Sequence, residues 1–274
     1  MLTRLKQRLN RAAAEDRGIL LGFLPAGYPT PAGFRAAARA AFDAGIDALE
    51  VSMPGPAPEL DGPIIQAAAL QAADHLSGIT EALQLAASSR TRPEDTIIAM
   101  AYARTFEGIT EDAFLDELAA ADVDALLLPQ HGVADQLAVG LHAQERGIEP
   151  VVFLHRQEDL PLLAASEIDH PVIYLQSADL QTGGTFNPVK AAERLDELSE
   201  ALADKPYSVC VGFGVRGTQE IAMLMAAGAD GAIIGTRFVV AAGQGAGLVA
   251  AIVEESAPAL VRGPARESQD VIHA

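Results

Sequence analysis

The sequence predicts an α/β fold in which strands and helices alternate along the whole chain. Eight short apolar runs each precede a segment with helical periodicity. Eight strand–helix units in about 250 residues are typical of a closed α/β barrel. Strands never follow one another directly, which disfavours hairpin sheets and implies a parallel sheet. An amphipathic segment, with Leu2, Leu5 and Leu9 on one face, precedes the first strand. We therefore expect a (β/α)8 TIM barrel with an extra N-terminal helix over one end.

Capping residues support the individual elements. Thr30 can cap the helix after the first strand, with Pro31 at its first position, and Gly45 ends it. Strands are expected at 18–23, 46–51, 96–101, 125–128, 150–154, 172–175, 208–211 and 231–234. Helices are expected at 1–16, 30–43, 64–73, 81–88, 111–121, 134–146, 158–165, 188–202, 218–227 and 248–261. The glycine-rich stretch 242–247 is interpreted as a flexible join before the last helix.

The competing architecture is a doubly wound open sheet. The first strand is followed by Phe23-Leu24-Pro25-Ala26-Gly27, which lacks the G-x-G-x-x-G pattern of dinucleotide-binding sheets. No linker stands out between the elements. We therefore expect residues 1–274 to form one phosphate-binding barrel domain.

Composition excludes several classes of function. The formal charge is 19 − 37 = −18, so the surface repels nucleic acid and anionic membranes. No apolar run reaches membrane length, and the N-terminus lacks a secretory pattern. Cys210 is the only cysteine and lies in an apolar run, so we interpret it as a core residue. The six histidines show no ligand spacing, and we expect a cytoplasmic enzyme with no metal and no cofactor.

Two carboxylates at the second strand are candidates for proton transfer. Glu50 is set within the apolar run Ala48–Val51, and Asp61 follows a proline-rich loop just before a helix. Burying a carboxylate is costly unless it is paired or functional. A partly exposed or hydrogen-bonded structural Glu50 is the alternative. In a barrel both residues would lie at the C-terminal end of the strands, where active sites are found.

Glycines after the last two strands indicate a phosphate site. Gly212-Phe213-Gly214 follows the seventh strand, and Gly235-Thr236 follows the eighth. Phosphate-binding barrels place backbone N–H donors at these two positions. Such donors bind an anion whatever the net charge of the protein. Ordinary turn glycines are the alternative reading, which the paired placement disfavours.

The chain resembles the alpha subunit of tryptophan synthase. The resemblance is carried by Leu49-Glu50-Val51, Leu60-Asp61-Gly62-Pro63-Ile64-Ile65-Gln66, Thr182-Gly183, Val211-Gly212-Phe213-Gly214 and Gly231-Ala232-Ile233-Ile234-Gly235-Thr236. It implies a lyase that cleaves indole-3-glycerol phosphate to indole and glyceraldehyde 3-phosphate in tryptophan biosynthesis. It also implies a PLP-dependent beta subunit as partner, in an alpha2beta2 assembly.

The resemblance assigns roles to individual residues. Glu50 matches the general acid/base, and Asp61 matches the acid that faces the indole nitrogen. The expected substrate-binding residues are Phe23, Met100, Tyr102, Leu128, Tyr174 and Thr182, of which Phe23, Met100 and Leu128 would form walls of the indole pocket. The expected phosphate-binding residues are Gly183, Gly214, Gly235 and Thr236.

Several positions depart from the family pattern. Ala57, Gln130 and Ala178 stand where the family has acids and an arginine that serve loop closure and contact with the beta subunit. We therefore expect coupling to a beta subunit to be weak. Two alternatives stay open: a catalytically weak alpha-like paralogue that binds a PLP beta subunit, and another phosphate-sugar barrel enzyme.

Overall fold

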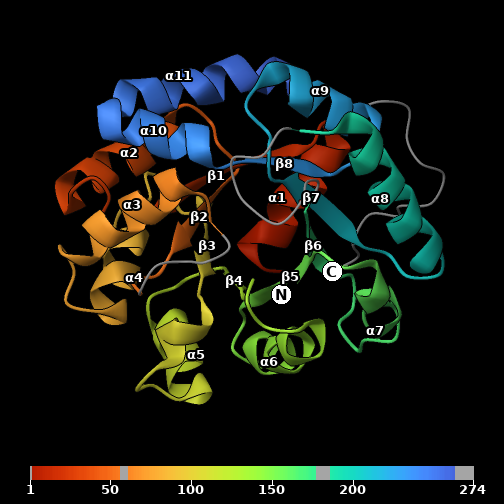
Figure 1. Cartoon of the computed structure of the whole chain (residues 1–274), viewed down its shortest axis with the longest axis horizontal. Coiled ribbons are helices and arrows are strands. Elements are labelled where there is room, and N and C mark those ends of the chain that lie inside the picture. Colours follow the sequence, from red (N-terminus) through yellow and green to blue (C-terminus); the bar gives the residue numbers. More distant parts are fainter. Residues whose placement is uncertain (1, 56–60, 177–185, 263–274) are drawn as a thin grey trace.

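Eight parallel strands close into a barrel in sequence order, with β8 hydrogen-bonded to β1 (Figure 1). The computed structural model describes residues 2–55, 61–176 and 186–262. The strands are β1 (Ile19–Pro25), β2 (Ala48–Ser52), β3 (Thr96–Met100), β4 (Ala125–Leu127), β5 (Glu149–Leu154), β6 (Val172–Gln176), β7 (Ser208–Gly212) and β8 (Gly231–Ile234). Every predicted strand overlaps an observed one, and the closed barrel confirms the expected fold. The open sheet is excluded.

Helices surround the barrel and connect its strands (Figure 1). They are α1 (Arg4–Ala14), α2 (Pro31–Asp43), α3 (Pro63–Ala73), α4 (Ile79–Ala87), α5 (Glu111–Ala120), α6 (Val133–Glu145), α7 (Leu160–Ala164), α8 (Pro188–Ala201), α9 (Thr218–Ala226), α10 (Thr236–Gln244) and α11 (Ala246–Ser256). Three 3₁₀ turns, η1 (Ala103–Phe106), η2 (Gln157–Asp159) and η3 (Ala257–Leu260), complete the described elements. In the described part of the chain, no helix is long and apolar enough to cross a membrane.

Local sequence explains where the helices begin. The Thr30 hydroxyl accepts a hydrogen bond from the Gly33 amide, and Pro31 opens α2, as predicted. Asn187 caps α8 in the same way through the Lys190 amide. The predicted flexible join at 242–247 is wrong. Helix α10 continues to Gln244, and only Gly245, at φ 141°, separates it from α11.

The strands alternate between two apolar layers, as a parallel barrel requires. Inward residues such as Phe23, Met100 and Phe153 fill the barrel, while their neighbours pack against the helices. Gly22 faces the helices, and a Cβ there would lie 2.6 Å from the Phe238 ring of α10. This missing side chain lets α10 pack closely on β1, which fixes the start of α10 at the C-terminal end of the barrel.

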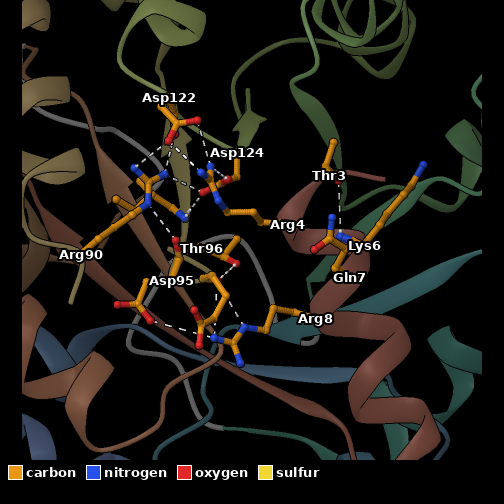
Figure 2. Close-up of polar contacts among 12 residues, drawn as sticks. Thr3, Arg4, Lys6, Gln7, Arg8, Arg90, Asp95, Thr96, Asp122 and Asp124 are labelled. Atoms are coloured by element: carbon orange, nitrogen blue, oxygen red, sulfur yellow. Dashed lines mark hydrogen bonds and ion pairs between the residues drawn. The ribbon is translucent and has the colours of Figure 1, made fainter. Parts of the chain in front are cut away.

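Helix α1 covers the N-terminal end of the barrel, as predicted. Leu5 and Leu9 pack with the inward residues of the strands. Arg4 donates to Asp122 and Asp124, which precede β4 (Figure 2). The Lys6 ammonium lies 3.1 Å from Glu149 at the start of β5. The functional end of the barrel is therefore the opposite one.

Candidate active site

A cavity of about 420 Å³ opens at the C-terminal end of the barrel. Residues from both chemical predictions line it: the two acids Glu50 and Asp61, and the glycine positions Gly214, Gly235 and Thr236. Pockets of this size hold small-molecule ligands. One cavity therefore joins the predicted acid pair to the predicted phosphate site.

Glu50 points into this cavity because of strand alternation. Its neighbours Leu49 and Val51 belong to the outer apolar layer, so Glu50 faces the barrel interior. The residue is 1% exposed, and its Oε2 atom has no hydrogen-bond partner among the described residues. Burial, reinforced by the nearby charge of Asp61, raises the pKa of Glu50 to about 8. Burial therefore favours the protonated form of Glu50 at neutral pH.

Asp61 lies before α3 and is held by an aromatic hydroxyl. The Tyr102 hydroxyl donates a short hydrogen bond to Asp61 Oδ2. Burial, followed by the charge of Asp61, raises the pKa of Tyr102 well above its usual value, so Tyr102 stays a donor. The two carboxyls thus differ, since Asp61 accepts a hydrogen bond that Glu50 lacks.

The turn after β3 orients Tyr102. The Tyr102 amide donates to the Thr105 hydroxyl at 3.1 Å, within η1. The side-chain oxygen of Gln130 accepts from the Ala103 amide at 3.0 Å and ties this turn to the end of β4. Gln130 therefore supports the turn that carries Tyr102, a contact that the sequence did not reveal.

The cavity has an apolar wall beside the acids. Phe23, Met100 and Tyr174 line it, as expected from the sequence. The expectation for Leu128 needs correction. Leu128 packs in the outer layer, and Leu127 lines the cavity, because the inward-facing residues of β4 are Ala125 and Leu127.

Aromatic rings extend the wall toward the glycines. The ring centroids of Phe153 and Tyr174 are 5.4 Å apart, and those of Tyr174 and Phe213 are 6.0 Å apart. Tyr174 lies over Gly212, where a Cβ would overlap its hydroxyl. Gly212 is therefore needed to admit the Tyr174 ring into the cavity.

The glycine side of the cavity suits an anion. Gly214 has φ 83°, a conformation that favours glycine, and Gly235 caps α10, whose first residue is Thr236. The first amides of a helix have no acceptor within it and carry a partial positive charge. Thr182 and Gly183, also expected at this site, lie outside the described residues.

A protein-family model matches nearly the whole chain that carries this site. That model, described as tryptophan synthase alpha chain, matches residues 9–259. The chain belongs to this family. A tryptophan synthase alpha chain of Streptomyces avermitilis is 32% identical over 239 residues, covering 86% of this chain and 84% of the relative. The tryptophan synthase alpha chain of Nocardia farcinica is 32% identical over 261 residues, covering 93% of this chain and 95% of the relative. A solved tryptophan synthase from Mycobacterium tuberculosis superposes with a TM-score of 0.81 at 27% identity, covering 96% of this chain and all of that one.

Several lining residues of this tryptophan synthase alpha-family site escaped the sequence reasoning. Two of them had a signal in the sequence. Alternation along β5 indicates Phe153, and the position between two glycines indicates Phe213. Arg216 and Arg237 also line the cavity, but single arginines two residues after a glycine carry no distinctive sequence signal.

The histidines at this end lie beside the cavity without lining it. The His155 ring stacks on Phe153 at 5.6 Å, and the His131 ring meets Phe106 edge-on at 5.4 Å. Burial lowers the pKa of each, which favours the neutral form. Within the described ranges, no cluster of His, Cys, Asp or Glu could hold a metal ion.

Proposed function

We propose that Glu50 and Asp61 divide the chemistry of indole-3-glycerol phosphate cleavage between them. Membership of the tryptophan synthase alpha chain family makes the chain a lyase of tryptophan biosynthesis, and indole-3-glycerol phosphate is its substrate. The products are indole and glyceraldehyde 3-phosphate. Because the chain belongs to this family, the alternative that it is another phosphate-sugar barrel enzyme is no longer needed.

The substrate spans the cavity from its apolar wall to its glycine side. The indole ring lies among Phe23, Met100 and Leu127, and Tyr174 separates it from the phosphate end. The phosphate accepts hydrogen bonds from backbone amides around Gly214 and at the start of α10. Binding of the substrate at both ends places its reacting carbon–carbon bond beside the carboxyl groups of Glu50 and Asp61.

Cleavage begins with a proton transfer from Glu50 to C3 of the indole ring. This step gives an indoleninium cation, whose positive charge is stabilised by the carboxylate of Asp61 near the ring nitrogen. The Glu50 carboxylate then takes the proton of the hydroxyl on the carbon attached to C3. The O–H electrons form the aldehyde, and the electrons of the broken carbon–carbon bond restore the aromatic ring. Glu50 ends protonated, ready for another turnover.

One observation carries this proposal: a buried Glu50 with a pKa of about 8 faces the same cavity as Asp61, which holds a hydrogen bond from Tyr102. A pair of carboxyls with different environments supplies both an acid and a stabilising anion at neutral pH. The apolar surroundings strengthen both effects, because they exclude water.

A beta subunit is the proposed partner of this chain. The relatives are named as alpha chains, and the Mycobacterium tuberculosis neighbour is a tryptophan synthase. The PLP cofactor belongs to that partner, and the chemistry proposed here uses only side chains of this chain. The expected cytoplasmic location stays a prediction, as does the single-domain organisation over 1–274.

The test is indole release from indole-3-glycerol phosphate by the purified wild-type chain and by Glu50→Gln. The variant should lose at least about 100-fold in kcat, typical of a lost general acid. Glu94→Gln, an exposed glutamate before β3 at the other end of the barrel, is the matched control and should keep wild-type turnover. Near-normal indole release by Glu50→Gln would show that Glu50 is structural.

A further inference from the structure

The cavity contains two cations in an otherwise acidic protein. Arg216 follows β7, and Arg237 lies in the first turn of α10. Both line the cavity, and the described part of its lining contains no other lysine or arginine. The net charge of −18 opposes entry of an anion, and so does the Asp61 carboxylate in the cavity. Local cations would offset that repulsion.

Arg237 is already engaged within the protein. Its Nη2 atom lies 2.7 Å from Glu255 Oε2, and its Nη1 donates to the Arg216 carbonyl at 2.8 Å. A Cβ on Gly217 would lie 2.8 Å from Nη1, so the absent side chain makes room for the guanidinium. The charge of Arg237 is therefore balanced by Glu255, and its structural effect is to hold the backbone at Arg216.

Arg216 has a fixed backbone and an available side chain. Its carbonyl accepts from Arg237, and the next amide, of Gly217, donates to Glu220 at 3.1 Å. Val215 on its other side is 4% exposed. The Arg216 side chain itself is exposed and makes no hydrogen bond or ion pair with the described part of the chain. An anchored residue with an unused guanidinium is well placed to bind a ligand.

We infer that Arg216 binds the phosphate group of the substrate and strengthens its binding. The inference rests on the proposed function, which places the phosphate at Gly214, Gly235 and Thr236. Backbone amides donate single hydrogen bonds, whereas a guanidinium supplies a full charge and a planar pair of donors that fits phosphate oxygens. Arg216 is thus a substrate-binding residue that adds charge to a cradle of neutral donors.

The test is direct binding, measured by isothermal titration calorimetry with glycerol 3-phosphate and with indole. The proteins are the wild-type chain, Arg216→Met, Arg216→Lys and Arg11→Met. Arg11 is an exposed arginine on α1, at the opposite end of the barrel, and its variant has the same change in net charge. Arg216→Met should weaken glycerol 3-phosphate binding about tenfold, equivalent to about 1.4 kcal/mol. Arg216→Lys should recover part of that loss, and Arg11→Met should bind as wild type does.

The outcomes separate this inference from the proposed function. Unchanged indole binding in Arg216→Met, together with weaker glycerol 3-phosphate binding, supports the inference even if the wild-type chain fails to cleave indole-3-glycerol phosphate. Equal glycerol 3-phosphate affinity in wild type and Arg216→Met overturns it, whatever the cleavage assay gives. A wild-type chain that binds no phosphate monoester overturns both the phosphate site and the role of Arg216.

Discussion

Glu50 is held in surroundings that favour its neutral form, and this has a cost for the fold. The residue is 1% exposed, one of its oxygens lacks a partner among the described residues, and Asp61 lies near enough to raise its pKa. An acid kept protonated at neutral pH can deliver a proton. The same burial destabilises the native state once Glu50 ionises.

Stability should therefore depend on pH through this residue. The pKa of Glu50 is about 8 in the folded chain, against 4.5 as its ordinary value. The native state keeps a proton that the unfolded state releases, so the contribution of Glu50 to stability is full below pH 4.5 and is lost as pH rises to 8. Glu50→Gln cannot ionise, and the stability of this variant relative to wild type should rise by about 3 kcal/mol between pH 6 and pH 9.

Urea unfolding of wild type, Glu50→Gln and Glu94→Gln at those two pH values measures this effect. The exposed Glu94 control should show a difference from wild type that does not change with pH. A Glu50→Gln advantage that is equal at pH 6 and pH 9 would mean that Glu50 is already ionised at neutral pH in the folded protein.

At the scale of single elements, the strands are anchored by aspartates at the end away from the site. Asp47, Asp124 and Asp230 precede β2, β4 and β8. Each accepts a hydrogen bond from a backbone amide of the preceding strand, donated by Leu20, Ile97 and Val209 respectively. Each also pairs with an arginine. The repeated contact fixes neighbouring strands in register, and with them the residues at their other ends.

Removing one of these contacts should destabilise the barrel. Asp124 is 2% exposed and lies 2.7 Å from Arg4 and 2.8 Å from Arg90 (Figure 2). Asp124→Asn should cost about 3 kcal/mol of unfolding free energy, because it removes the buried charge that pairs with both arginines. Asp122→Asn is the control: Asp122 is 67% exposed and contacts the same arginines, and its change should cost less than about 1 kcal/mol.

Thermal or urea unfolding compares the two variants. Equal losses of unfolding free energy for Asp122→Asn and Asp124→Asn would show that the burial of Asp124 does not determine its contribution to stability. Indole release by folded Asp124→Asn should match wild type, because the contact lies at the opposite end of the barrel from the cavity.

At the scale of the whole molecule, the resemblance predicts altered coupling to a beta subunit, because Ala57, Gln130 and Ala178 occupy the positions that it assigns to this contact. Gln130 is occupied within the chain, where it accepts from the Ala103 amide. Ala57 and Ala178 lie outside the described residues, but neither side chain can accept a hydrogen bond or bridge a carboxylate. Loop closure by a partner raises turnover through such contacts.

Activation by a beta subunit should consequently be weak. We expect addition of a purified tryptophan synthase beta subunit to raise indole release by less than about tenfold, or about 1.4 kcal/mol in barrier height. A second experiment uses Ala57→Asp, which restores the acid that the family pattern has at this position. This variant should be activated more strongly by the same beta subunit, while its turnover without the beta subunit stays as in wild type. Strong activation of the unmodified chain would show that coupling uses other residues.

The barrel and half of the site followed from periodicity and turn residues, whereas side-chain packing decided the rest. The carboxylate within the apolar run of β2 and the glycines after the last two strands indicated the two parts of the cavity, whereas helix α10 was not among the predicted helices. The run that contains β4 is apolar at every position, so its sequence does not show that Leu127 rather than Leu128 faces the cavity. The contact of Gln130 with the turn that carries Tyr102 depends on tertiary structure, and no local pattern signals it.

The role of Glu50 as the acid can be tested by the pH dependence of kcat/KM for indole release, which reports the ionisation of the free enzyme. If protonated Glu50 starts the reaction, kcat/KM of wild type should fall above pH 8, approaching tenfold per pH unit, in line with the raised pKa of Glu50. A profile that stays flat from pH 7 to pH 9.5, with indole release intact, would contradict the assignment of Glu50 as the acid.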